Sequence, residues 1–230
     1  MIDFHAHILP GADHGSDGIE TSLRQLELAE AAGVNTIVAT PHFYPQTDRF
    51  SDFLALRERT CSQLINRYHG PIRILLGAEV HMCVGLDHLE GIEELCVSGT
   101  QVILSELSFR GFAGNMGETF ERMQDAGLIP ILAHVDRYEH RLIDNYFSLG
   151  LLGQVNADAL IRHLGRRQLI RWIDEGFVIA MGSDIHGTEI GYSHFSKARA
   201  ILGGRATSLE HAAKTLLEGA LSVTETNPDA

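Results

Sequence analysis

Residues 1–15 read MIDFHAHILPGADHG and place His5 and His7 inside an apolar, strand-like run. Histidines in such a run need a ligand or a hydrogen-bond partner, because burying an unpartnered polar group costs free energy. The i, i+2 spacing of the two histidines directs both side chains to the same side of an extended chain. The stretch therefore predicts a first strand with a polar site at its C-terminal end.

Six further strand-like runs follow and alternate with helical patterns. The predicted strands span residues 1–8, 34–40, 72–80, 101–107, 129–135, 151–157 and 177–184. Helical apolar spacing occupies residues 19–33, 51–68 and 159–176, and a short helix is expected within 81–99. Apolar strands that alternate with helices indicate a parallel sheet buried on both faces. We predict an α/β protein, a distorted (β/α)7 barrel forming a single domain over residues 1–230.

Potential metal ligands stand at the C-terminal ends of almost all these strands. They are His5, His7, His42, Glu79, Glu106, His134, Asp184 and His186. The C-terminal ends of parallel barrel strands meet at one rim, where barrel enzymes place their sites. An open sheet would leave ligands at its two edges far apart, so the pattern favours a closed or nearly closed barrel. Imidazole and carboxylate groups suit zinc, manganese or iron, and the pattern predicts a multinuclear metal site.

Composition narrows the possible functions. The chain has 18 Lys and Arg against 30 Asp and Glu, a net charge of -12, which argues against a general nucleic-acid binder and suits a cation-binding protein. We find no signal peptide and no apolar run long enough to span a membrane, so no membrane insertion is expected. Cys61, Cys83 and Cys96 are odd in number and widely spaced, which is typical of reduced thiols in a cytoplasmic protein.

Seven stretches, in order along the chain, carry a family resemblance. They read MIDFHAHILPGADHG, AGVNTIVATPHFYP, LLGAEV, VILSELSF, PILAHVDRY, GQVNADAL and GSDIH. The chain resembles the polymerase-and-histidinol-phosphatase (PHP) superfamily, and within it the metal-dependent protein-tyrosine phosphatases of bacterial capsule and exopolysaccharide synthesis, the CpsB/CapC family. The resemblance implies the TIM-barrel-like PHP fold with three divalent metal ions, typically Mn2+, with Fe or Zn also found in the superfamily.

The resemblance also implies roles for individual residues. One metal would take His5, His7 and Asp184, with Glu79 bridging it to a second metal. Glu106 and His134 would hold that second metal. The third would take His42, His186 and His14, or Asp13 in place of His14. Arg137, in the HVDRY motif, would orient the substrate phosphate, and His42 is also expected to be essential for catalysis.

Two departures from the family pattern leave alternatives open. The family usually has two aspartates where this chain has Asp13-His14-Gly15. It also tends to carry Arg-Pro-Pro after Asp-x-His, where this chain reads GTEIGYSH, with Gly191 near the arginine position. Either the phosphate is held less tightly, or Arg49 or Arg110 compensates. The second departure bears on the substrate rather than on metal binding.

The expected function is hydrolysis of phosphotyrosine in proteins by a metal-activated water. The expected partner is the tail of a bacterial tyrosine kinase that regulates capsule or exopolysaccharide synthesis. The alternative is a PHP phosphoesterase acting on a small phosphate ester, like histidinol phosphatases; a non-catalytic metal-binding protein is a further option. C–N hydrolysis by a barrel amidohydrolase would usually need a metal-bridging lysine on a strand, and the two lysines, Lys197 and Lys214, lie outside the predicted strands.

Three further features have more than one interpretation. Cys61 and Arg67 have the C-x5-R spacing of cysteine-dependent tyrosine phosphatases, but they lie in a glycine-free helical pattern unlike a phosphate-binding loop. His81 is either a surface residue or a contact of the metal site. Phe43 and Tyr44 either flank an aromatic substrate or pack in the core.

Overall fold

The computed structural model describes residues 1–108, 116–188 and 192–219 and has parallel strands throughout its sheets. In chain order the strands are β1 (Ile2–Ala6), β2 (Thr36–Ala39), β3 (His42–Phe43), β4 (Arg73–Leu76), β5 (Glu79–His81), β6 (Val102–Glu106), β7 (Ile129–Leu132), β8 (Leu152–Asn156) and β9 (Val178–Gly182). They form two sheets, ordered β1-β2-β4 and β3-β5-β6-β7-β8-β9. The predicted α/β class with parallel strands is confirmed.

The strand predicted over 72–80 is split into β4 and β5 by Gly77 and Ala78, and the short β3 follows the strand predicted over 34–40. Thr40 and Pro41 separate β2 from β3. Hydrogen bonds bridge the interruption, since Gly77 N–H donates to Ala39 O (2.9 Å) and Glu79 N–H to Pro41 O (3.0 Å). β2 with β3, and β4 with β5, therefore occupy one strand position each, and the seven predicted positions are retained.

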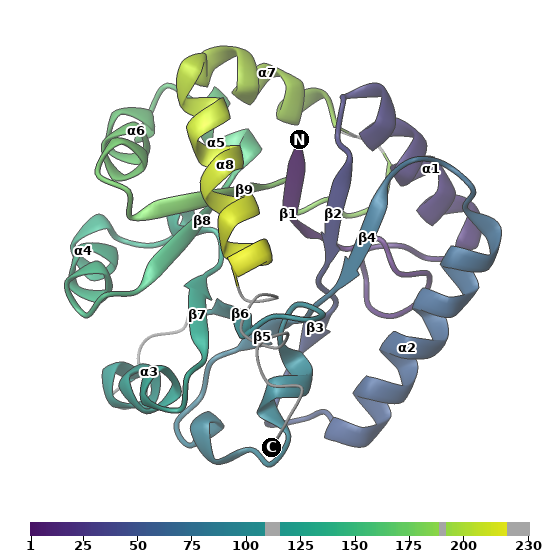
Figure 1. The fold of residues 1–230 in the computed structure, drawn as a ribbon, viewed down its shortest axis with the longest axis horizontal. Helices are drawn as coiled ribbons and strands as arrows, with labels where there is room; N and C mark the ends of the chain where they lie inside the picture. The colour runs from purple at the N-terminus through teal and green to yellow at the C-terminus, as the bar shows by residue number, and fades with distance from the viewer. Residues whose placement is uncertain (109–115, 189–191, 220–230) are drawn as a thin grey trace, which may run out of the picture.

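The strands surround a common centre, and β1 lies beside β9 (Figure 1). The two sheets share no ladder at this seam. Instead, residues just after β9 bond to β1: Asp184 N–H donates to His5 O (2.8 Å) and His7 N–H to Ile185 O (3.3 Å). The two edges of the predicted barrel thus meet through individual hydrogen bonds at the C-terminal rim, without a continuous ladder.

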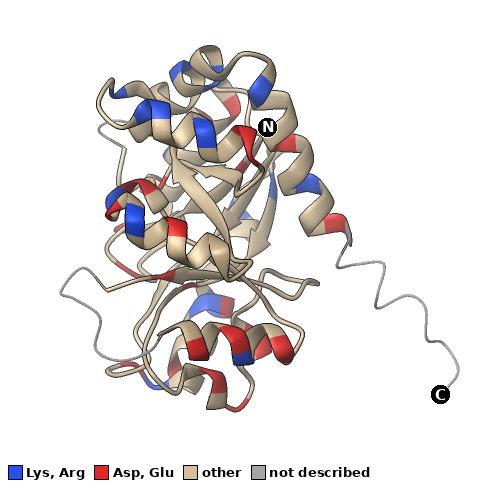
Figure 2. Ribbon diagram, turned by 90° about the vertical axis from the view of Figure 1, so that its left-hand side faces the viewer, with Lys and Arg blue, Asp and Glu red and all other residues tan. Residues whose placement is uncertain are grey.

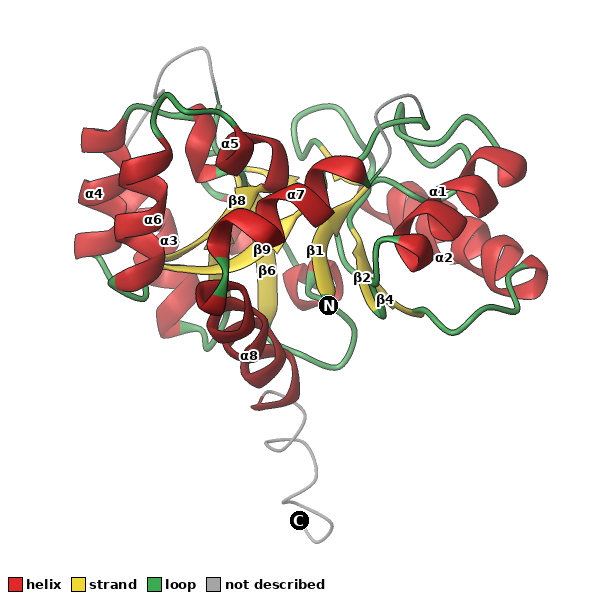
Figure 3. Cartoon of the chain, turned by 90° about the horizontal axis from the view of Figure 1, so that it is seen from above, coloured by secondary structure: helices red, strands yellow, loops and turns green. Residues whose placement is uncertain are grey.

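Helices surround the strands (Figures 1 and 3). They are α1 (Ile19–Ala31), α2 (Phe50–Arg67), α3 (Met116–Asp125), α4 (His140–Ser148), α5 (Ala157–Ile161), α6 (Arg166–Asp174), α7 (Ser193–Leu202) and α8 (Gly204–Gly219). The single helix predicted over 159–176 is wrong. Arg162 is extended and Gly165 adopts φ 82°, so the chain leaves helical geometry between α5 and α6. In 81–99 the structure has two 3-10 turns, Leu86–His88 and Ile92–Leu95.

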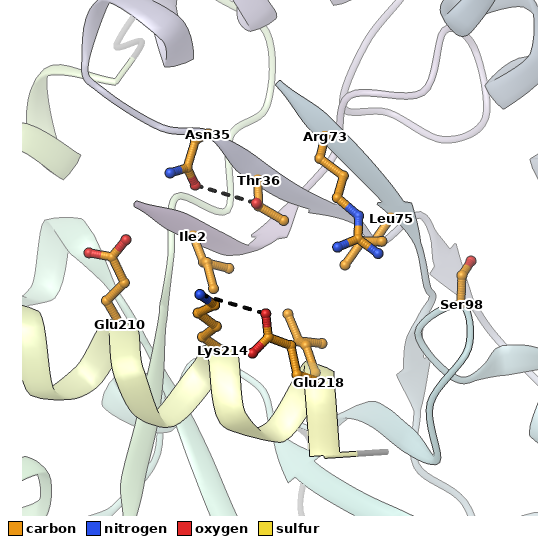
Figure 4. A pocket seen from close by; sticks show the side chains of 10 residues that line it. Ile2, Asn35, Thr36, Arg73, Leu75, Ser98, Glu210, Lys214 and Glu218 are labelled. Atoms are coloured by element: carbon orange, nitrogen blue, oxygen red, sulfur yellow. Dashed lines mark hydrogen bonds and ion pairs between the residues drawn. The ribbon is translucent and has the colours of Figure 1, made fainter. Parts of the chain in front are cut away.

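One apolar cluster fills the space inside the strands. It includes Phe4, Val38 and Leu104, and it is covered by Ala213 and Leu217 of α8. Figure 1 shows α8 lying across this end of the barrel, and a cavity of about 290 Å3 separates it from the starts of β1, β2 and β4 (Figure 4). None of the sequence-predicted metal ligands lines that cavity. With α8 over the N-terminal ends of the strands, the candidate site lies at the opposite, C-terminal rim.

The helices carry charges of both signs. On the side drawn in Figure 2, Lys and Arg are intermixed with Asp and Glu. No helix in the described ranges combines the length and the apolar composition needed to cross a membrane.

Candidate metal centre

A β-bulge in β1 directs the first two histidines into the barrel. β1 pairs with β2 in the register Asp3↔Ile37 and Ala6↔Ala39, so β1 has one extra residue between these pairs. Phe4 consequently belongs to the interior cluster, while His5, the next residue, also faces inward toward Glu79 and Asp184. Both histidines are buried, and their Nε2 atoms lie 3.0 Å apart.

Glu79 lies where three of the strand ends meet. Its Oε2 atom is 3.2 Å from Nε2 of His5, 3.2 Å from Nε2 of His7 and 2.9 Å from Nδ1 of His42. Its other oxygen, Oε1, is 2.8 Å from Nε2 of His134, which is 3.4 Å from Glu106. The β3–β5–β6 ladder produces this convergence, because it sets His42 opposite Glu79 and brings β6, which ends at Glu106, alongside.

Two site residues have unusual backbone conformations. In the described ranges, His134 (φ 31°) and Asp184 (φ 50°) are the non-glycine residues with positive φ. Residues other than glycine rarely adopt positive φ, and those that do are concentrated at functional sites. This conformation turns Asp184 so that its Oδ1 lies 3.6 Å from His5, 3.4 Å from His7 and 3.5 Å from His186.

Asp13 and His14 have different surroundings. Asp13 Oδ2 lies 2.7 Å from His7 Nδ1 and accepts a hydrogen bond from His42 N–H, while Oδ1 accepts one from Gly15 N–H. Asp13 therefore orients His7. The exposed His14 ring has its centroid 4.9 Å from that of His42 and 4.6 Å from that of His186. All nine sequence-predicted metal ligands are thus brought to one rim.

Electrostatics keep the carboxylates ionised. Burial would raise the pKa of Glu79, but the adjacent His5 and the hydrogen bond with His134 hold it well below its usual range. Burial likewise opposes a low pKa at Glu106, yet the contacts with His134 and His81 bring it to about 2. Burial would lower the pKa of His134, but Glu106 and Glu79 raise it to about 9. The buried, ionised carboxylates therefore favour the binding of cations at this site.

This donor set fits divalent metal ions. Glu79 Oε2 and His42 Nδ1 are buried without a properly aligned hydrogen bond, although they lie 2.9 Å apart. In the described residues, three groups have ligand atoms within 4.8 Å of one another: His5, His7 and Asp184; His42, Glu79 and Glu106; and His7, His42 and His186. Cations bound among these atoms would use the unpaired nitrogen and oxygen lone pairs.

Several supporting residues were missed by the sequence analysis. Gln154, fully buried on β8, lies with its Oε1 3.2 Å from His5 Nδ1 and accepts a hydrogen bond from His134 N–H at 2.8 Å. Gln25, on α1, donates to the backbone carbonyls of His7 and Gly187. These amides fix the orientation of the candidate ligands. Gln154 lies in the GQVNADAL stretch, but the neighbouring sequence does not indicate that its side chain faces the candidate site.

Arg137 lies beside the cluster, donating from Nη2 to Asp184, which also accepts from Asn156 Nδ2 at 2.9 Å. Its side chain is 41% exposed and lines a cavity of about 220 Å3 that also reaches Asp184 and His186. His194, for which the sequence predicted no role, lines the same cavity. Of the two alternative arginines, Arg49 is exposed and lies 3.8 Å from Asp52, and Arg110 falls outside the described residues, as does Gly191.

The surroundings of Cys61, His81 and the Phe43–Tyr44 pair distinguish between the interpretations given for each from the sequence. Cys61 is buried in α2, and burial raises the pKa of its thiol, which rules against a cysteine nucleophile there. His81 Nδ1 lies 3.2 Å from Glu106 Oε2, so it contacts the site rather than standing apart from it. Phe43 is buried against Phe50 and Phe53, whereas Tyr44 is partly exposed.

The chain is similar to known tyrosine phosphatases in sequence and in fold. The chain is 26% identical over 214 residues to the tyrosine-protein phosphatase YwqE of Bacillus subtilis (strain 168), covering 88% of this chain and 84% of that protein. Its fold matches a crystal structure from a study of YwqE from Bacillus subtilis and CpsB from Streptococcus pneumoniae, described as unique metal-dependent tyrosine phosphatases. That match has a TM-score of 0.82, 23% identity and coverage of 95% of this chain and 94% of the other.

A more distant fold match is histidinol phosphate phosphatase from Lactococcus lactis, solved with Zn, L-histidinol and phosphate. Here the TM-score is 0.55, with 13% identity and coverage of 95% and 93% of the two chains. The family model described as capsular polysaccharide synthesis, CpsB/CapC, matches residues 1–221. A match over nearly the whole sequence, with the histidine and carboxylate rim inside it, means that the chain belongs to the CpsB/CapC family.

Proposed function

We propose that this protein is a metal-dependent phosphatase that hydrolyses phosphotyrosine in proteins. The observation that carries the proposal is the convergence of Glu79 and Asp184 on His5 and His7, with Arg137 directly beside Asp184. The similarity to YwqE supports phosphotyrosine as the substrate class. The family description supports a role in capsular polysaccharide synthesis, and we propose that the substrate is the tail of a bacterial tyrosine kinase.

We propose that three divalent ions, Mn2+ in the first instance, bind this centre. His5, His7, Asp184 and Glu79 would hold the first; Glu79, Glu106 and His134 the second; and His42, His186 and His14 the third. His14 is favoured over Asp13 because both Asp13 oxygens already have partners, whereas the His14 ring faces His42 and His186. Bound cations of this kind supply the Lewis acidity that activates water and offsets charge on phosphoryl oxygens.

The chain's own residues would bind and orient the phosphate. Arg137 offers a planar guanidinium fork that matches phosphoryl oxygens, and its contact with Asp184 fixes one end of that fork. Asn156 donates to the same Asp184 oxygen, Oδ2, as Arg137 does, which leaves Oδ1 directed at His5 and His7. A tyrosine leaving group, with a pKa of about 10, needs less protonation than an alkyl alcohol does. We place the enzyme in the cytoplasm, which its three free cysteines support.

Substrate comparison tests the proposal. Purified protein supplied with Mn2+ should hydrolyse a phosphotyrosine peptide and simple aryl phosphates, lose activity with a chelator, and regain it when Mn2+ is restored. Histidinol phosphate is included because the Lactococcus lactis enzyme shares the fold. Turnover of histidinol phosphate alone would replace the proposal with a small-molecule phosphatase. Activity that survives the chelator but not thiol alkylation would exclude the metal mechanism.

Two variants test the proposed roles. His42→Ala and Arg137→Ala should each reduce kcat/KM on the phosphotyrosine peptide by about 100-fold or more, because the first removes a proposed metal ligand and the second a donor to the phosphate. Arg137→Lys should recover only part of the loss, because lysine keeps the charge without the planar fork. Arg24→Ala is the matched control, since Arg24 is an exposed arginine paired with Glu27 on α1. Equal activity of Arg137→Ala and Arg24→Ala would remove Arg137 from the site.

A further inference from the structure

Among the described residues, Tyr44 is the one large aromatic residue whose side chain is exposed. It is 37% exposed, and the other exposed large apolar residues there are aliphatic. A single exposed apolar side chain on a protein surface is ordinary. Tyr44, however, directly follows β3, whose first residue is His42, so its ring lies at the rim of the candidate metal centre.

Strand geometry separates Tyr44 from its neighbour Phe43. Successive side chains of an extended chain point to opposite sides. Phe43 is buried against Phe50 and Phe53, on the side away from Glu79. Tyr44 shares the side of His42, and the two ring centroids are 5.4 Å apart with an interplanar angle of 23°.

The Tyr44 ring is also held from a second strand and by its own backbone. Its centroid is 5.6 Å from that of His81, which contacts Glu106 on β6. Tyr44 N–H donates to Asp48 Oδ2 at 2.8 Å, and its carbonyl accepts from the N–H groups of Thr47 (3.0 Å) and Asp48 (2.9 Å). A turn over residues 44–48 therefore holds the backbone of Tyr44, and two imidazoles contact its ring, which lowers the entropic cost of stacking.

We propose that Tyr44, supported by His81, forms an aromatic wall at the entrance to the metal centre that stacks on the ring of aryl phosphates and favours them over alkyl phosphates. This inference rests on the proposed phosphatase function and adds a residue that sets the substrate class. Tyr44 acts through binding of the aryl group and takes no part in cleaving the phosphoester. Offset stacking between aromatic rings is worth about 3- to 10-fold in affinity.

Binding of two non-hydrolysable probes tests the wall separately from catalysis. Phenylphosphonate and methylphosphonate present the same anionic group to the centre and differ in the aromatic ring. For the Mn2+-loaded protein, Tyr44→Ala and Tyr44→Leu should weaken phenylphosphonate by about 3- to 10-fold and leave methylphosphonate unchanged. Tyr44→Phe should behave like the wild type, because it keeps the ring. Ile65→Ala, which removes an exposed apolar side chain from α2, is the matched control.

Each outcome decides the inference. Equal weakening of both phosphonates in Tyr44→Leu and Tyr44→Ala would assign Tyr44 to supporting His42 and overturn the wall; so would no change in either probe. Measuring the bound metal in each variant shows whether weaker phosphonate binding results from loss of Mn2+ instead. If the wild type hydrolyses no aryl phosphate yet the phenylphosphonate contrast holds, the proposed function fails while the aromatic wall stands.

Discussion

At the scale of single residues, Gly182 determines how closely β9 approaches the first histidine. A Cβ atom at this position would lie 2.5 Å from Cβ of His5, 2.7 Å from Nε2 of Gln154 and 3.2 Å from the backbone nitrogen of His5. Real Cβ atoms do not approach other atoms this closely, and one of the neighbours is backbone. The absence of a side chain thus allows β1, β8 and β9 to converge beneath the candidate metal centre.

Gly182→Ala should therefore displace His5 and weaken metal binding. We expect a loss of about 1–3 kcal/mol in the free energy of unfolding from overpacking, and a metal affinity lower by about 10- to 100-fold, as when residues supporting a ligand are changed. Calorimetric Mn2+ titration and chemical denaturation would measure the two effects. Gly204→Ala is the control, because a Cβ there meets no atom within 4 Å. Unchanged Mn2+ affinity in Gly182→Ala would contradict this account.

The identity of the candidate ligands was predictable residue by residue, but their conformations were not. Strand-end histidines and carboxylates stand out in the sequence because polar groups are expensive to bury. Positive φ at His134 and Asp184 leaves no such trace, since both residue types also occur in ordinary conformations. The supporting role of Gln154 is likewise invisible locally, because its partners His5 and His134 are distant in sequence.

At the scale of elements, strand and helix periodicity predicted the order of the fold but not its irregularities. The bulge in β1 turns the neighbouring side chains of Phe4 and His5 inward together. In a regular strand, neighbouring side chains would point to opposite faces. Helical spacing across 159–176 continued through residues that the structure places between α5 and α6, where Gly165 permits a left-handed conformation. Such breaks depend on contacts with other elements, and local pattern cannot reveal them.

The seam between β1 and β9 depends on Asp3. This buried carboxylate accepts hydrogen bonds from Ser183 N–H (2.8 Å), Ser183 Oγ (2.6 Å), Tyr192 Oη (2.7 Å) and His5 N–H (3.3 Å). It thereby joins β1 to the segment that continues into Asp184 and to the start of α7. Asp3 and Ser183 therefore link the seam to Asp184 in the candidate metal centre.

Tyr192→Phe should weaken this seam. Removing one donor from a buried carboxylate costs about 1–3 kcal/mol, and we expect the free energy of unfolding to fall by that amount. Metal affinity should fall as well, because Ser183 adjoins Asp184. Tyr68→Phe is the matched control: its hydroxyl accepts from Ile72 N–H (3.1 Å) beside α2, away from the centre. If both variants lost stability but neither lost Mn2+ affinity, the seam would be structural only.

At the scale of the whole molecule, the arrangement of the strands around a common centre assembles the candidate site. His5, Glu106 and His186 are separated by up to 181 positions, yet each belongs to the same rim. The ring brings them together, while α8 and the interior apolar cluster cover the other end. Stability is therefore divided between an apolar core that needs no metal and a polar rim whose buried carboxylates favour cations.

This division predicts how the molecule responds to metal removal. The chelated protein should stay folded on its apolar core and unfold at a lower temperature than the metal-loaded form. Free Mn2+ at about 100 times its Kd adds about 2.7 kcal/mol, which corresponds to about 5–10 °C in Tm for a chain of this size. Calorimetric scans at increasing Mn2+ would measure the shift. Glu106→Gln should reduce it, while Glu118→Gln, which changes an exposed glutamate on α3, should not. A Tm independent of Mn2+, with both variants melting alike, would mean that the rim binds no cation.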